Sequence, residues 1–230
     1  MGYYLYDRFG VSVSTSTIHD VLTRRGWNRK VAKKITAERS EPLRALFRAK
    51  SVFWHPQQIV FVDESASNER TGDRKYGWSP VSNPCHDYRY LKRDKRWSVL
   101  PALTLNGYLR DPLIIQGAVT KELFLEWMAH VLLPQLEPGM ILVLDNASIH
   151  HGVELSELCM SVGVRVEYLP PYSPDLNPIE QSFNVLKAWV RRHIEEAIMY
   201  RDFGEFMRYA VESNGGSERA MGWFKESGYM

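Results

Sequence analysis

The spacing of hydrophobic and polar positions changes near residue 58. Before it, apolar residues are sparse and recur at helical spacing. Residues 3–9 predict a short helix that Gly10 ends in a left-handed cap, and Ser14 can cap a second helix running to about Arg25. After residue 58, short runs of apolar residues appear that are typical of buried strands. The pattern therefore predicts a small helical N-terminal part and a larger α/β part.

The larger part alternates predicted strands with predicted helices. The strands are expected at 58–63, 98–104, 113–116, 140–145 and 164–168. A turn at Asn106–Gly107 is expected to join the second strand to the third. Helices are expected after Thr120, over about 153–162, and from Pro178. The order β-β-β-α-β-α-β-α indicates an α/β fold with a mixed sheet covered by helices.

Composition limits the kind of protein this can be. Its apolar stretches are far too short to span a bilayer, and the first residues do not have the pattern of a secretory signal. Cys85 and Cys159 are the only cysteines, so we expect no disulfide framework and a reducing, intracellular setting.

Positive charge is concentrated in one segment of the chain. The net charge is +2, but residues 24–50 hold ten Lys/Arg and only two Glu. Such a segment favours a polyanion partner, although a solvated helix face would have the same composition. The two short N-terminal helices resemble a helix-turn-helix, a pattern that simple helix packing also produces. The basic run 24–34 beside them favours duplex DNA.

Two acids stand where apolar strands end. Asp63 follows the run 58–62, and Asp145 follows the run 140–144. Ligand sites in open α/β sheets lie at this edge, so neighbouring strands would bring the two carboxylates together. Like charges repel at close range, so a cation between them is expected. Hard oxygen ligands suit Mg²⁺ or Mn²⁺.

A third acid follows a segment that is rich in proline. Four prolines fall within residues 170–178, and Glu180 comes just after them. Asn177 is a good N-cap residue and Pro178 suits the first helical position, which places Glu180 in the first turn. A face of apolar residues would fix this helix in the core: Ile179, Phe183, Leu186 and Val190. The structural alternative is a capping box in which Glu180 only bonds back to the Asn177 amide.

Three motifs carry a family resemblance. "VDES" at 62–65, "DNASIHH" at 145–151 and "LPPYSPDLNPIEQSFNVLKAW" at 169–189 closely resemble the DDE transposases of the mariner superfamily. Thirty-four residues separate Asp145 from Glu180, as in the insertion-sequence-like branch that ends its triad in Glu. The resemblance extends from about Val11 to Tyr229.

The resemblance implies a fold, a chemistry and a division of the chain. An RNase H-like fold is expected, with Asp63, Asp145 and Glu180 holding two Mg²⁺ (or Mn²⁺) ions per site and no organic cofactor. The family hydrolyses a phosphodiester at the transposon end, and the freed 3′-hydroxyl then attacks target DNA, usually at TA. A partial helix-turn-helix and basic linker is expected over 1–50, the catalytic domain over 51–200 and a C-terminal helical extension over 201–230.

Further site residues follow from their positions in these motifs. Asn146, His150 and Asn177 are expected to support the triad. For His150 a metal role is the alternative to packing and hydrogen bonding in its loop. The residues expected to contact DNA are Arg24, Arg25, Arg29, Lys30, Lys33, Lys34, Arg93, Lys95, Arg96 and Lys187. Three of these lie in the segment 75–97, where the family carries a loop that contacts DNA and the partner subunit. A solvated hairpin is the alternative.

Partners and location follow from the same resemblance. Double-stranded DNA is the expected partner, in a homodimer without membrane contact, in the nucleus if the source is eukaryotic and otherwise in the cytoplasm. The family usually carries two helix-turn-helix modules, whereas only the second is expected here, so the resemblance is to an N-terminally truncated copy. A domesticated, catalytically silent DNA-binding protein is therefore the main alternative function. An RNA-processing nuclease of the same fold is a weaker one.

Overall fold

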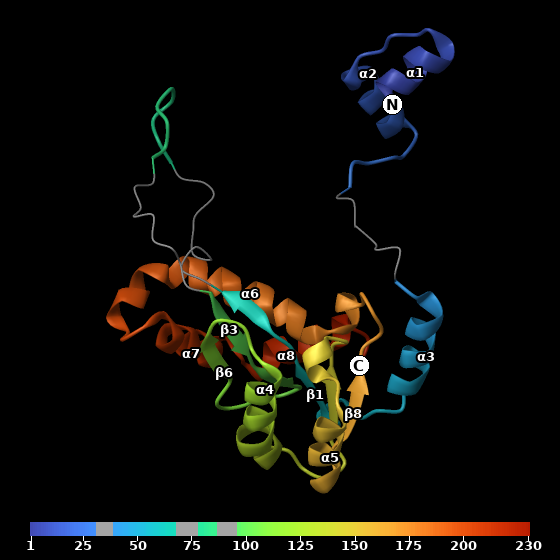
Figure 1. Ribbon diagram of the computed structural model, residues 1–230. Coiled ribbons are helices and arrows are strands. Elements are labelled where there is room, and N and C mark those ends of the chain that lie inside the picture. Colours follow the sequence, from blue (N-terminus) through green and yellow to red (C-terminus); the bar gives the residue numbers. More distant parts are fainter. Residues whose placement is uncertain (31–38, 68–77, 87–95) are drawn as a thin grey trace. The chain divides into compact units, whose positions relative to one another are not determined.

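The computed structural model describes residues 1–30, 39–67, 78–86 and 96–230 (Figure 1). The chain forms two compact units, Met1–Ala37 and Glu38–Met230.

The N-terminal unit contains the two predicted helices, α1 (Gly2–Phe9) and α2 (Thr15–Arg24). Gly10 ends α1 with a φ of 65°, and the Ser14 hydroxyl accepts a hydrogen bond from the Thr17 amide, so both predicted caps are confirmed. Neither helix contains a buried residue. On α2, Ile18 and Leu22 are half-buried and Val21 is exposed.

The larger unit is built on a mixed sheet of five strands. Their order is β5 (Gly107–Tyr108), β4 (Ala102–Thr104), β1 (Ile59–Val62), β7 (Ile141–Leu144) and β8 (Arg165–Tyr168). β1, β7 and β8 run parallel, while β4 and β5 pair antiparallel at the other side. The α/β class predicted from the sequence, with its mixed sheet, is confirmed.

The predicted strand 98–104 is wrong in one respect, because it forms two strands in two sheets. β3 (Trp97–Leu100) pairs with β2 (Ser65–Ser67) and β6 (Leu113–Gln116) in a three-stranded sheet, whereas β4 belongs to the large sheet. Pro101 separates β3 from β4 and has no amide to donate to a ladder. The turn at 106–107 consequently joins β4 to β5 and not to β6.

Helices cover both faces of the five-stranded sheet. Three were predicted: α4 (Lys121–Trp127), α5 (Val153–Ser161) and α6 (Pro178–His193). α3 (Glu41–Ser51) was not expected as a helix. α7 (Phe203–Asn214) and α8 (Ser217–Glu226) lie within the helical extension expected over 201–230. Beyond α4 the chain continues as a π-helical turn and a short 3₁₀ turn. A further 3₁₀ turn, η6 (Pro174–Leu176), precedes α6.

Alternating residues of the central strands form two apolar cores. Ile59, Phe61 and Val143 point to the face covered by α3, α6, α7 and α8. Val60, Val62 and Leu144 pack instead with residues of α4 and α5. Each fully buried aliphatic side chain contributes roughly 1.5–3 kcal/mol. The strand ends are therefore held by packing from both sides.

The C-terminal helices belong to the same core. Phe206 of α7 and Phe224 of α8 are fully buried among residues of α6 and β1. The division of the chain at residues 50 and 200 stays a prediction. Within the described part of the chain, no helix combines the length and apolar character needed to cross a membrane.

Candidate active site

Strand pairing places the two aspartates at one edge of the sheet. β1 and β7 are parallel neighbours, with Val62 opposite Leu144 as their last pair. Asp63 and Asp145 follow immediately, so their side chains leave adjacent strands at the same level. Glu180, in the first turn of α6, joins them in lining a pocket of about 490 Å³. The structure thus brings together the three acids that the sequence singled out.

A proline-rich loop forms the opposite wall of this pocket. Residues 169–174 and Asn177 line it, together with Asn146 and Ala147. Tyr172 has a φ of 53°, a left-handed conformation that costs a non-glycine residue about 1–2 kcal/mol. The loop therefore depends on surrounding contacts to keep its path toward α6.

The first carboxyl, Asp63, is half-buried and hydrogen-bonded at both oxygens. Oδ1 accepts from the Glu64 amide at 2.7 Å, and Oδ2 accepts from Asn177 Nδ2 at 2.8 Å. Burial raises the pKa of Asp63 to about 7, with the nearby charges of Asp145 and Glu180 adding to the effect. Near neutral pH this carboxyl retains a proton for part of the time.

The second carboxyl, Asp145, is biased in the opposite direction. Burial alone would raise its pKa, but the hydrogen bond and charge of His150 and the bond from the Ala147 amide outweigh it, so the pKa lies below its ordinary value. His150 Nδ1 and Asp145 Oδ1 share a hydrogen bond of 2.6 Å. Asp145 is therefore ionised at neutral pH while its neighbour Asp63 holds a proton more tightly.

Asn177 uses its side chain differently from what its position suggests. It stands at the N-cap of α6 but makes no side-chain capping bond, so the predicted capping role is wrong. Its amide group instead reaches Asp63, 114 residues away in sequence. The Asn177 backbone amide donates to the Pro174 carbonyl at 3.1 Å, so it is not the partner that a capping box would give Glu180.

Two histidines support the strand that carries Asp145. His150 is 2% exposed, and its ring lies 4.8 Å from the Phe124 ring. Its buried Nε2 has no hydrogen-bond partner among the residues that the structure describes. His151 Nε2 and Asn146 Oδ1 lie 2.8 Å apart, and the His151 ring stacks on Tyr168 at 4.5 Å. Little in the sequence pattern pointed to His151, and nothing in it pointed to Tyr168.

The chemistry of the donor set fits a hard divalent cation. Three carboxyl groups converge on one partly open pocket, where burial raises the pKa of Asp63 and the charges of Asp145 and Glu180 add to the effect. The buried Asn177 Oδ1 adds a further oxygen, to which no group in the described part of the chain donates a hydrogen bond. Among the described residues no cluster of three or more His, Cys, Asp or Glu side chains forms a ready-made metal cage. The carboxylates would have to draw closer around a bound ion.

The residues predicted to contact DNA are only partly described. Arg24, Arg25, Arg29 and Lys30 are exposed on the N-terminal unit, and Lys187 is half-buried on α6. Lys33, Lys34, Arg93 and Lys95 lie outside the described residues. Arg96 is exposed but forms an ion pair of 3.0 Å with Glu64, the residue after Asp63.

Comparisons with known proteins address both units. A model of the DDE superfamily endonucleases matches residues 58–200, more than half of the chain. A winged helix-turn helix model matches residues 1–51. A search of curated proteins finds no match.

Solved structures of Mos1 transposase share the fold. A Mos1 paired-end complex with left transposon end is 16% identical, with a TM-score of 0.62, over 99% of this chain and 74% of that one. A mariner Mos1 paired end complex with Mg is 17% identical, with the same TM-score and coverage. A Mos1 strand transfer complex is 16% identical, with a TM-score of 0.59, over 98% and 76% of the two chains.

Proposed function

The chain belongs to the DDE superfamily of endonucleases, and from this membership we propose that it is a transposase of the mariner type that cleaves and rejoins DNA. The fold is RNase H-like, and the strand order of the large sheet is consistent with the family match. The proposed reaction is hydrolysis of a DNA phosphodiester, followed by attack of the freed 3′-hydroxyl on a second DNA strand.

The observation that carries this proposal is the convergence of three acids. Asp63, Asp145 and Glu180 come from two strands and a helix that are far apart in sequence, yet they line one pocket. All three fall within the part of the chain matched by the endonuclease model. A merely structural acid at a strand end would not require two partners of the same charge, because their repulsion is unfavourable.

We assign the three carboxylates as the ligands of divalent metal, Mg²⁺ or Mn²⁺, with two ions per site. Bound there, the metal would neutralise charge developing at the phosphate and activate the attacking oxygen. The chain's own residues orient the ligands. His150 holds Asp145 in its ionised form, and Asn177 fixes one oxygen of Asp63. Asp63 has to release its proton before it can serve as a ligand.

Duplex DNA is the proposed substrate and partner. The exposed Arg24, Arg25, Arg29 and Lys30 supply positive charge on the unit matched by the winged helix-turn helix model, which suits contacts to phosphates. Recognition of transposon ends, a TA target, a homodimer and nuclear location are further parts of this proposal. Each follows from the family resemblance.

Nicking of supercoiled plasmid by the purified chain tests the proposal directly. We expect relaxed circles to accumulate with Mg²⁺ or Mn²⁺, none with EDTA, and none with Asp145→Asn. Nicking that persists in Asp145→Asn would point to a contaminating nuclease and would leave the assignment unsupported. Tight DNA binding by a wild-type protein that never nicks would favour the alternative function, a catalytically silent DNA-binding protein.

A further inference from the structure

The helix α3 carries an arginine where an apolar residue would be expected. Arg44, Phe47 and Ser51 form its buried face, and Arg44 is 0% exposed. Phe47 packs edge-on against Trp54 at 5.5 Å, within the core of the larger unit. Apolar packing thus sets the position of α3, and Arg44 is buried because it lies on the same face of the helix as Phe47.

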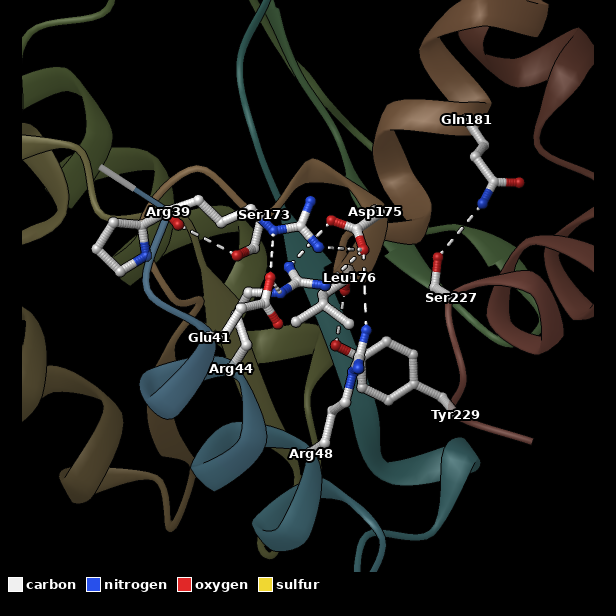
Figure 2. A network of polar contacts seen from close by, with 11 residues as sticks. Arg39, Glu41, Arg44, Arg48, Ser173, Asp175, Leu176, Gln181, Ser227 and Tyr229 are labelled. Atoms are coloured by element: carbon white, nitrogen blue, oxygen red, sulfur yellow. Dashed lines mark hydrogen bonds and ion pairs between the residues drawn. The ribbon is translucent and has the colours of Figure 1, made fainter. Parts of the chain in front are cut away.

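Arg44 contacts one carboxylate of its own helix and one of the proline-rich loop. Its Nε lies 3.5 Å from Glu41 Oε1. Its Nη1 and Nη2 donate to the two oxygens of Asp175, at 3.0 and 2.6 Å, in a two-pronged contact (Figure 2). Arg39 and Arg48 lie 3.7 and 3.9 Å from the same carboxylate. Arg44 pulls the pKa of Asp175 below its ordinary value despite the opposing effect of burial.

Stability alone does not account for this arrangement. Taking an arginine out of water costs several kcal/mol, and well-packed apolar residues commonly replace buried ion pairs without loss. An apolar side chain at position 44 would suit the packing of α3. What only the guanidinium provides is a fixed direction, because its planar fork grips both oxygens of a carboxylate.

Asp175 lies in the loop between two residues that line the pocket, Pro174 and Asn177. Asp175 is the middle residue of η6, between Pro174, which lines the pocket, and Leu176. Asn177, the residue that binds Asp63, follows two positions later, and Glu180 three positions after that. The loop also contains the strained Tyr172, so holding it in place requires external contacts.

We propose that Arg44 is a positioning residue for DNA cleavage: by holding Asp175 it fixes the loop 170–177, and through the loop it places Asn177 and Glu180 at the pocket. This inference rests on the proposed function, since the placement matters for the chemistry assigned to that pocket. Arg44 does not line the pocket, so its effect on metal binding is indirect.

A second ion pair on the same helix provides a matched control. Lys50 Nζ lies 2.6 Å from Glu167 of β8 and so ties α3 to the sheet, away from the loop. Both substituted side chains are about half-exposed, Lys50 at 51% and Asp175 at 48%. Lys50→Gln removes one ion pair of α3 without touching the loop. Asp175→Asn removes the loop's ion pairs with Arg44, Arg48 and Arg39, of which the Arg44 contact is the shortest. Asp175→Asn also leaves the buried Arg44 facing a neutral acceptor, so melting curves should first verify that this variant is folded under the assay conditions.

The experiment compares these variants in the full chain, with Mn²⁺ as the probe. Hydrogen exchange would follow the amides of Leu176 and Asn177, which bond to Ser173 and Pro174 within the loop. In Asp175→Asn we expect their exchange to be about tenfold faster and the Mn²⁺ concentration for half-maximal plasmid nicking to be about tenfold higher. Lys50→Gln should change both by less than about twofold.

Arg44→Lys keeps the charge but loses the two-pronged geometry, and it should behave as Asp175→Asn does. Because both variants break the Arg44–Asp175 contact, the Arg44→Lys/Asp175→Asn double variant should be no worse than the poorer single variant. If Arg44→Lys does not fold, the comparison of Asp175→Asn with Lys50→Gln still tests the proposal.

The inference is overturned if Asp175→Asn matches Lys50→Gln in loop exchange and in Mn²⁺ dependence. It is also overturned if the effects of Arg44→Lys and Asp175→Asn simply add. A wild-type chain that neither binds Mn²⁺ nor nicks DNA would instead defeat the proposed function. Loop exchange in Asp175→Asn would then still report whether Arg44 holds the loop.

Discussion

Asp63 and Asp145 leave the ends of two buried parallel strands, whereas Glu180 stands on a helix that a proline-rich loop leads into the same pocket. We call these two sides the strand wall (β1 and β7 with Asp63 and Asp145) and the loop wall (residues 169–180). They face each other across one pocket, but different forces hold them.

The strand wall is fixed by backbone hydrogen bonds and by packing on both faces. β1 and β7 are buried at every position, and four pairs of residues are in register between them. A single side chain removed from the periphery leaves this ladder intact. The spacing of the two aspartates is therefore insensitive to all but core substitutions.

The loop wall is fixed by side chains from distant parts of the chain. Arg44 of α3 holds Asp175, and the Tyr229 hydroxyl donates to the Leu176 carbonyl at 2.7 Å (Figure 2). Gln181 reaches Ser227 at 3.3 Å. Both ends of the larger unit thus contribute to the position of Glu180, and single substitutions there should move it.

The largest expected effect comes from removing an acid from either wall. Asp145→Asn on the strand wall and Glu180→Gln on the loop wall should each lower the metal-dependent nicking rate at least about 10³-fold, because each removes a proposed metal ligand. Circular dichroism and melting curves would verify folding. Glu64→Gln is the control, a neighbouring carboxylate that does not line the pocket. Full activity in either acid variant would remove that residue from the triad.

Sequence reasoning was most successful for the strand wall. A run such as Ile141–Leu144 is uniformly apolar because both of its faces are buried, and the acid after it marks the sheet edge. What the sequence did not contain was the pairing that makes β1 and β7 neighbours, which depends on contacts 82 residues apart in register. The family motifs supplied that step.

The contacts of the loop wall were largely beyond sequence reasoning. α3 was missed because its buried stripe contains Arg44, which reads as polar until Asp175 is placed beside it. Asn177 fits the pattern of an N-cap residue, but its bond to Asp63 spans 114 positions. The prediction of one strand over 98–104 was wrong for a reason visible in the sequence. Pro101 has no amide hydrogen and cannot continue the hydrogen-bond ladder of a strand.

A second prediction tests the electrostatics of the strand wall. The pKa of Asp63 is raised from 3.8 to about 7. The folded state therefore binds this proton more tightly, and the resulting stability is fully present below about pH 4 and is lost as pH rises through 7. Above pH 7 the folded protein has to hold Asp63 ionised in a partly buried site, which destabilises it. Asp63→Asn carries no charge there, so without metal the variant should be more stable than the wild type at pH 8 by roughly 2–4 kcal/mol.

Thermal melts in EDTA at pH 4, 6 and 8 would measure this difference. The gap between variant and wild type should close as the pH falls toward 4. Melting temperatures that stay parallel at all three pH values would show that the pKa of Asp63 is not raised in the folded protein, either by burial or by the neighbouring carboxylates.

A third prediction concerns the histidine behind the strand wall. His150→Leu keeps much of the volume but loses the bond to Asp145, so Mn²⁺ affinity should fall about 10- to 100-fold. His150→Asn, which can still donate to Asp145, should recover most of the affinity. Calorimetric titration with Mn²⁺ would compare the two. Equal losses in both would mean that the ring is needed for packing against Phe124 and not for its hydrogen bond.

The smallest expected effect distinguishes two ways of positioning Glu180: through contacts of the loop or through contacts of α6. Tyr229→Phe should lose the bond to the Leu176 carbonyl, and Tyr108→Phe should lose the bond to Ser182 on α6, each costing about 1 kcal/mol of stability. Only Tyr229→Phe should also speed hydrogen exchange in the loop and shift the Mn²⁺ dependence of nicking, by about two- to threefold. If Tyr108→Phe shifts both equally, Glu180 is positioned through the core of α6. The loop wall would then be held by packing, as the strand wall is, and the distinction between them would be lost.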